Sequence, residues 1–154
     1  NITLIKPSIR SKYEAFWRTS LKPVCFGEQS LENAINFINN NLSSCIAHEK
    51  AQWLFDNTHE ASATEFTISD YRQEWRKEHI VDRTLIDDGV RWIIDYKSTR
   101  ISDNQNKADF LSQQEEIYRP QLKRYAELFQ AMEDLPIRTA LFFTSIPHWH
   151  EIEL

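Results

Sequence analysis

Apolar side chains in the first third of the chain recur three and four residues apart, the spacing of one helix face. This pattern predicts a short helix over residues 12–19 and a longer one over residues 31–42. Ser30 stands directly before the longer stripe and is a candidate N-cap, because its hydroxyl can accept a hydrogen bond from a free N–H of the first turn. Residues 47–56 fit a further short helix. The first part of the chain is therefore expected to be helical.

The pattern changes to alternation after residue 60. Residues 63–69 alternate between polar and apolar, and residues 78–86 and 90–97 are rich in β-branched and aromatic side chains, as strands are. Asp88-Gly89 lies between the last two segments and favours a tight turn, since glycine tolerates a positive φ. These three segments predict an antiparallel meander.

Residues 98–109 are polar and lack apolar periodicity, which indicates a surface loop. A long helix is expected next, from Ser112 or Ile117 to Met132, with Pro120 in the first turn of its regular part. Two more strands are predicted, over residues 137–144 and 148–153. Helices, a meander, a long helix and further strands make an α/β fold with a mixed central sheet and flanking helices.

The 154 residues fit a single domain, with residues 1–60 as a helical lead-in and residues 61–154 as its core. The sequence begins at Asn1 and its one methionine is Met132, which suggests a piece of a longer polypeptide. Cys25 and Cys45 match no zinc motif and are expected to be free thiols in a reducing compartment. No apolar run approaches the length of a membrane span, so a cytoplasmic protein without a membrane partner is expected.

Charged residues interrupt the two strands on either side of the predicted turn. Asp95 and Lys97 are two apart on one strand and point to the same face, while Trp92 and Ile94 point to the other. Asp82 interrupts the preceding strand, and a hairpin turning near residue 88 places it opposite Asp95. The hairpin therefore predicts two carboxylates and one ammonium group at one place.

Two carboxylates, a backbone carbonyl and water are the ligands that Mg²⁺ prefers. Mg²⁺ held there would activate water and offset charge on a phosphate, with Lys97 orienting that water or stabilising the transition state. Hydrolysis of a phosphodiester fits these groups better than glycosyl transfer does, since that reaction needs two acids and no lysine. The same spacing also fits a structural ion pair.

The segments Val81-Asp82-Arg83 and Trp92-Ile93-Ile94-Asp95-Tyr96-Lys97 resemble the PD-(D/E)xK nuclease signature. More narrowly, they look like the C-terminal nuclease domain of the exodeoxyribonuclease V beta subunit and of similar UvrD-like bacterial helicases. The later segment Gln121-Leu122-Lys123-Arg124-Tyr125 is similar to that family's Gln-x-x-x-Tyr motif. The strand over residues 137–143 is also similar, and the resemblance covers roughly residues 50–150.

The resemblance implies a restriction-endonuclease-like core and a Mg²⁺-dependent deoxyribonuclease of the exonuclease type, with Mn²⁺ as a substitute. Asp82, Asp95 and Lys97 would be catalytic, and Asp82, Asp95 and the Tyr96 carbonyl would bind the metal. Gln121 and Tyr125 would line the DNA path, although Tyr125 is equally explained as an amphipathic core residue with a satisfied hydroxyl group. The expected partners are DNA, the ATP-binding helicase domains of the same polypeptide, and other subunits of a bacterial DNA-repair complex.

The sequence departs from this family in one respect, because no upstream Gly-x-x-x-His metal ligand is found. Glu65 is a candidate replacement, and it is equally a solvated acid. His148 and His150 form a His-x-His pair that suggests zinc only weakly. The net charge of −5 is unusual for a DNA-binding protein. The alternative function is therefore an inactive nuclease-like module that binds DNA or docks a repair partner.

Overall fold

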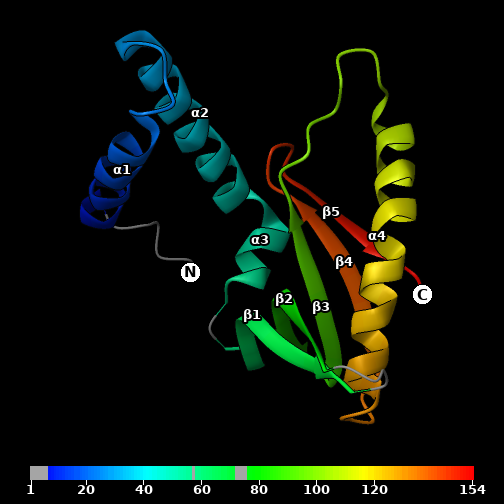
Figure 1. Cartoon of the computed structure of the whole chain (residues 1–154). Helices are drawn as coiled ribbons and strands as arrows, with labels where there is room; N and C mark the ends of the chain where they lie inside the picture. Colours follow the sequence, from blue (N-terminus) through cyan, green and yellow to red (C-terminus); the bar gives the residue numbers. More distant parts are fainter. Residues whose placement is uncertain (1–6, 57, 72–75) are drawn as a thin grey trace. The chain divides into compact units, whose positions relative to one another are not determined.

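A computed structural model describes residues 7–56, 58–71 and 76–154 of the chain (Figure 1). The chain divides into two compact units, Asn1–Asp56 and Asn57–Leu154. The division falls close to the expected boundary between a helical lead-in and a core at residue 60.

The first unit consists of helices α1 (Pro7–Leu21), α2 (Glu28–Ala47) and α3 (Glu49–Leu54). The three predicted helices are present, but Ser30 is not an N-cap, because α2 already begins after Gly27. Gly27 has φ 85°, a conformation that glycine adopts without a Cβ clash, and its carbonyl accepts the Leu31 N–H. Arg18 on α1 forms ion pairs with Glu14 on the same helix and Glu32 on α2, and so ties the two helices together.

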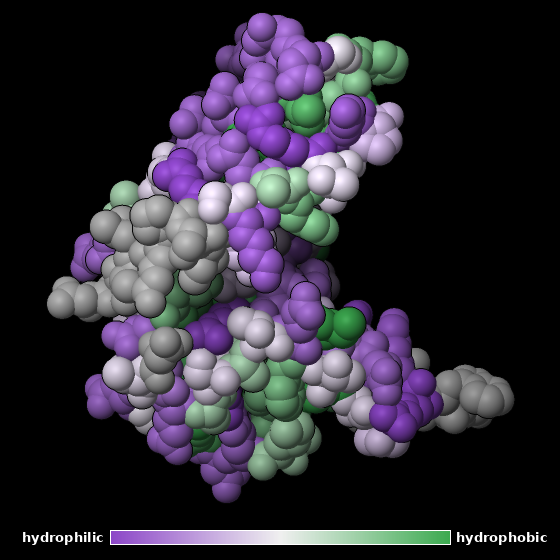
Figure 2. All heavy atoms as spheres, turned by 90° about the vertical axis from the view of Figure 1, so that its left-hand side faces the viewer, coloured by the Kyte–Doolittle hydropathy of each residue, from purple (hydrophilic) through white to green (hydrophobic). Residues whose placement is uncertain are grey.

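Aromatic side chains remain on the surface of this helical unit. Phe26, in the turn between α1 and α2, is 98% exposed, and Tyr13 and Phe16 on α1 are more than half exposed. On the face drawn in Figure 2, hydrophobic residues lie among more numerous hydrophilic ones. Cys25 and Cys45 are free thiols, as predicted, but only Cys45 of the two is buried, and Cys25 is partly exposed.

The second unit is built on a five-stranded mixed sheet of order β1-β2-β3-β4-β5. The strands are β1 (Glu60–Asp70), β2 (Lys77–Asp87), β3 (Val90–Lys97), β4 (Ile137–Phe143) and β5 (His148–Ile152). The first three form the predicted antiparallel meander, β4 joins β3 in parallel, and β5 returns antiparallel to β4. The α/β class with a mixed sheet is therefore confirmed.

Edge strand β1 is irregular. Its pairing with β2 shifts in register between Glu60 and Ala63, and Ala61 and Glu65 have φ angles of 44° and 50°. Positive φ is unusual for residues with a side chain and marks local departures from a flat strand. The edge of the sheet at β1 is consequently not a regular ladder.

Helix α4 (Lys107–Gln130) makes the crossover between β3 and β4 (Figure 1). Its predicted start at Ser112 or Ile117 was wrong, because Asn106 caps the helix earlier by accepting the Asp109 N–H at 2.9 Å. Pro120 consequently lies inside the helix and not in its first turn. None of the helices in the described ranges is long and apolar enough to cross a membrane.

One face of the sheet packs against α4 to form the core of the second unit. Leu122, Ala126 and Phe129 of α4 belong to one buried cluster with residues of β3 and β4, namely Ile93, Leu141 and Phe143. At the far end of the helix, the Arg91 guanidinium on β3 pairs with Glu133 at 2.6 Å and lies over the Phe129 ring. The core therefore fixes α4 along the length of β3.

Candidate metal and catalytic site

The register of the β2–β3 hairpin brings the two predicted acids together. At its open end the ladder pairs Thr84 with Ile93 and Arg83 with Ile94, so the next positions outward are Asp82 and Asp95. The Asp82 carboxylate is also close enough to raise the pKa of Asp95. The predicted cross-strand placement of Asp82 and Asp95 is therefore confirmed.

Asp82 lies where the two strands stop pairing through their backbones. Its Oδ2 accepts the backbone N–H of Tyr96 at 2.8 Å. The burial pattern of β2 also changes here. Just before Asp82, every second residue is buried, and just after it three consecutive residues are buried. Asp82 itself is half-buried, and its Oδ1 has no protein donor within the described part of the chain. One oxygen is thus held by the backbone while the other can accept a ligand.

Asp95 is the most buried acid of the site, with 3% of its surface exposed. Its Oδ2 pairs with the Lys97 ammonium group, and its Oδ1 accepts a hydrogen bond from Gln121 at 3.1 Å. Burial raises the pKa of Asp95 above its ordinary value, the Lys97 ammonium opposes this shift, and the Asp82 carboxylate adds to it. Additional positive charge near this carboxylate would therefore be favourable.

Lys97 ends β3 and is fixed at both its backbone and its side chain. Its carbonyl accepts the Thr144 N–H at 2.8 Å at the end of β4. The ammonium group, besides pairing with Asp95, lies 3.7 Å from the centroid of the Tyr118 ring on α4. Its side chain is 15% exposed, so solvent reaches it from one side.

Gln121 and Tyr125 form a hydrogen-bonded chain beneath Asp95. The Gln121 amide donates to Asp95 and, at 2.8 Å, to the Tyr125 hydroxyl. That hydroxyl in turn donates to the Ile80 carbonyl on β2 at 3.1 Å. Tyr125 is only 5% exposed and belongs to the core, as the alternative prediction had it. Through these contacts, Gln121 and Tyr125 hold the Asp95 side chain in place. Their role in lining a DNA path stays a prediction.

The donor set suits a divalent cation that prefers oxygen. Asp82 offers an uncommitted carboxylate oxygen, and Asp95 already holds a cation in the form of the Lys97 ammonium group. Mg²⁺ in proteins is commonly held by one or two carboxylates, with water and substrate phosphate completing its shell. Asp82 and Asp95 therefore fit the group, whereas the predicted part of the Tyr96 carbonyl stays a prediction.

The additional metal ligands predicted from the sequence gain no support from the structure. Glu65 lies between Thr64 and Phe66, which pair with Arg83 and Val81, so the register sets it opposite Asp82; it is exposed, has φ 50°, and its part as a metal ligand stays a prediction. Among the described residues, no group of three or more His, Cys, Asp and Glu side chains could hold a metal ion. His150 pairs with Glu115 at 2.9 Å and His148 lies 3.2 Å from the Lys107 ammonium group, so the zinc interpretation of this pair gains no support.

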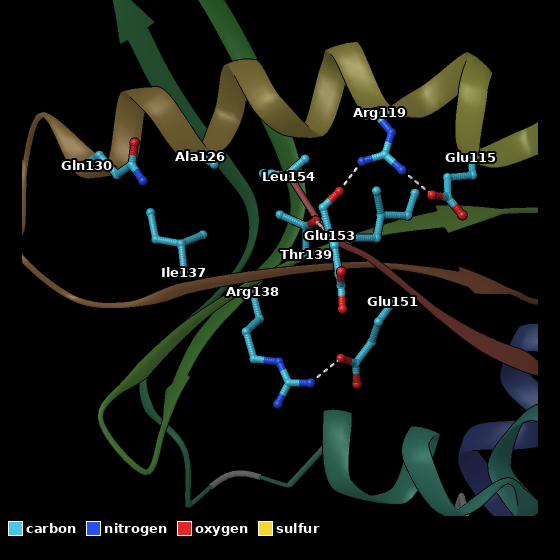
Figure 3. A pocket seen from close by; sticks show the side chains of 11 residues that line it. Glu115, Arg119, Ala126, Gln130, Ile137, Arg138, Thr139, Glu151, Glu153 and Leu154 are labelled. Carbon is cyan, nitrogen blue, oxygen red and sulfur yellow. Dashed lines mark hydrogen bonds and ion pairs between the residues drawn. The ribbon is translucent and has the colours of Figure 1, made fainter.

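A separate cavity of about 860 Å³ lies among α4, β4 and β5 (Figure 3). Its two cations are already paired, Arg119 with Glu115 and Arg138 with Glu151. Arg119 also donates to the Glu153 carbonyl. Asp82, Asp95 and Lys97 are not among its lining residues, so this cavity is not the cleft of the candidate site.

Tyr118 had no predicted role, although its ring lies against the Lys97 ammonium group. Its spacing was the available signal, because Tyr118, Gln121 and Tyr125 recur at intervals of three and four and so share one helix face. No protein-family model matches the chain, and no curated protein matches it significantly.

Proposed function

We propose that this chain is a metal-dependent DNA nuclease domain that hydrolyses phosphodiester bonds. The observation that carries the proposal is the convergence of Asp82, Asp95 and Lys97 where the β2–β3 ladder ends. A buried carboxylate, a second carboxylate with a free oxygen and a partly exposed ammonium group are costly to bring together without a use.

The residues of the site would have separate roles in the reaction. Asp82 and Asp95 would hold Mg²⁺, which supplies Lewis-acid stabilisation of the negative charge on the phosphate. Lys97 would place its ammonium group beside the scissile phosphate and stabilise the charge that develops there. Gln121 keeps the Asp95 carboxylate in one orientation, and Tyr125 keeps Gln121 in place.

The order of elements supports a restriction-endonuclease-like core as the finer fold assignment. The acids lie on an antiparallel hairpin, and a helical crossover leads from its second strand to a parallel neighbour. Together with the motif resemblance, this supports a place in a bacterial helicase–nuclease, with DNA and helicase domains as partners. Exonuclease-type cleavage is part of the same proposal.

The test is cleavage of linear DNA by the purified chain with Mg²⁺ or Mn²⁺, compared with cleavage in chelator. Lys97→Met should abolish cleavage, whereas Lys123→Met, which removes an equal charge from an exposed position on α4, should not. Removing Lys97 leaves Asp95 buried without its cation and should lower the melting temperature in chelator. Mg²⁺ should restore that temperature. A Lys97→Met chain that cleaves at the parent rate would refute the proposal and leave a structural ion pair.

An inactive nuclease-like module that binds DNA or docks a repair partner is the second candidate. The net charge of −5 and the absence of a third carboxylate or histidine ligand among the described residues favour it. It predicts no metal-dependent cleavage, even when helicase domains are supplied in the assay.

A further inference from the structure

The Lys97 ammonium group has two partners of different kinds, and this matters for any cation bound by Asp95. One partner is the Asp95 Oδ2 and the other is the face of the Tyr118 ring, 3.7 Å from the ring centroid to the nitrogen. Both Asp95 oxygens are engaged, because Oδ1 accepts the Gln121 hydrogen bond. A divalent cation that binds the Asp95 Oδ2 would therefore share this oxygen with the Lys97 ammonium group or displace that group from it.

We propose that Tyr118 is a positioning residue that keeps the Lys97 ammonium group at the site when the Asp95 carboxylate binds a divalent cation. This inference rests on the proposed function, because it assumes that Asp82 and Asp95 bind the cation. A lysine side chain released from the Asp95 carboxylate would gain rotamer freedom and move toward solvent. The face of an aromatic ring attracts an ammonium group through its quadrupole without competing for the metal.

The placement of Tyr118 on α4 supports this role. Tyr118 packs against the buried cluster of the second unit, so its ring does not depend on Lys97 for its position. One turn farther along the helix, Gln121 fixes Asp95. The same helix face therefore holds the Asp95 carboxylate through Gln121 and the Lys97 ammonium group through Tyr118. The contact with Lys97 can remain when Asp95 binds a divalent cation in place of Lys97.

Nuclear magnetic resonance of the whole chain tests the proposal without an activity assay. The ring current of Tyr118 should shift the Lys97 ε-methylene resonance upfield, and Lys97→Met identifies that resonance by its loss. The upfield shift should persist at saturating Mg²⁺, while the resonances of Asp82 and Asp95 report that Mg²⁺ has bound. It should survive in Tyr118→Phe and disappear in Tyr118→Leu. Tyr71→Leu is the matched control, since Tyr71 is also near a cation, Arg76, but is not part of the site.

Kinetics add a second readout. Tyr118→Leu should lower kcat by about tenfold with little change in KM, and Tyr118→Phe should restore the parent kcat. If Mg²⁺ binds while the Lys97 ε-methylene resonance moves to the chemical shift of a free lysine, the positioning role of Tyr118 is wrong and the nuclease proposal stands. If Asp82 and Asp95 do not respond to Mg²⁺, both proposals fail. Binding and a retained shift without DNA cleavage would refute the nuclease proposal and support the positioning role.

Discussion

Asp82 Oδ2 accepts the Tyr96 backbone N–H at 2.8 Å, beyond the last backbone pair of the β2–β3 ladder. A side chain of β2 thus makes the contact that a backbone carbonyl would make in a continuing ladder. This ties the first acid of the site to the strand that carries the second. The separation of the two carboxylates is consequently set by backbone geometry and not only by side-chain packing.

Asp82→Asn and Asp82→Ala should separate the metal-binding and structural roles of this residue. Asparagine keeps an oxygen that accepts the Tyr96 N–H, so Asp82→Asn should melt near the parent temperature and lose Mn²⁺ affinity by at least about tenfold. Asp82→Ala should also lose about 1–2 kcal/mol of unfolding free energy. Calorimetry and melting curves measure the two effects, with Asp88→Asn in the turn as control. Unchanged Mn²⁺ binding in both variants would remove Asp82 from the ligand set.

Tyr125→Phe should destabilise the chain although it keeps the ring in the core. The hydroxyl joins Gln121 to the Ile80 carbonyl, and its loss leaves two polar groups without this partner. We expect the free energy of unfolding to fall by about 1–2 kcal/mol in urea denaturation. Equal stability of the variant and the parent would show that water replaces the hydroxyl.

Arg91→Met should be more destabilising than the removal of an exposed arginine. Arg91 is buried and pairs with Glu133, whose side chain is 22% exposed, and it also lies over the Phe129 ring. Its loss should cost about 2–4 kcal/mol. Arg138→Met removes a paired but 55% exposed arginine and should cost less than about 1 kcal/mol. Comparable costs in urea denaturation would contradict the structural role assigned to Arg91.

The contact between α1 and α2 should weaken in acid. The Arg18 guanidinium, through its hydrogen bond, holds the pKa of Glu32 below its ordinary value. A lowered folded-state pKa contributes stability above the unfolded-state pKa, and this is lost as pH falls through the folded-state pKa. The Glu32 carboxyl resonance should therefore titrate below the range of a free glutamate, and Arg18→Met should return it to that range. A Glu32 pKa unchanged by Arg18→Met would refute this pairing in solution.

The chain by itself should bind DNA weakly and with strong salt dependence. Its net charge of −5 provides little of the counterion release that drives non-specific affinity. Addition of the proposed helicase part should improve binding greatly, as fluorescence anisotropy would measure. Tight binding by the chain alone in high salt would contradict the need for a partner.

The strands and the acid pair were predictable because their signals are local. The turn at Asp88-Gly89 and the alternation of β3 determine which residues of the two strands face each other, and they predict that Asp82 lies opposite Asp95. The resemblance could add roles to these residues but not contacts. The ion pair between Asp95 and Lys97 follows from the same two-residue period.

The helix boundaries and the supports of the site were harder to predict. The first turn of α4 was missed because Lys107 and Asp109 are polar and the start is set by the Asn106 cap, although Phe110 in the same turn is buried in the core. Likewise, the contacts of Tyr118 and Gln121 with β3 depend on how α4 docks across the sheet. Such contacts join residues more than twenty positions apart, and sequence spacing alone does not specify them.

The positive φ angles in β1 affect how the molecule behaves among its own copies. An edge strand exposes backbone donors and acceptors that a strand of another chain can pair with, which is a route to aggregation. Ala61 and Glu65 turn away from extended geometry at two places in eleven residues, so only short stretches of this edge have regular spacing. A second chain can therefore pair regularly only with the stretch from Phe66 to Asp70, which limits growth of the sheet at this side.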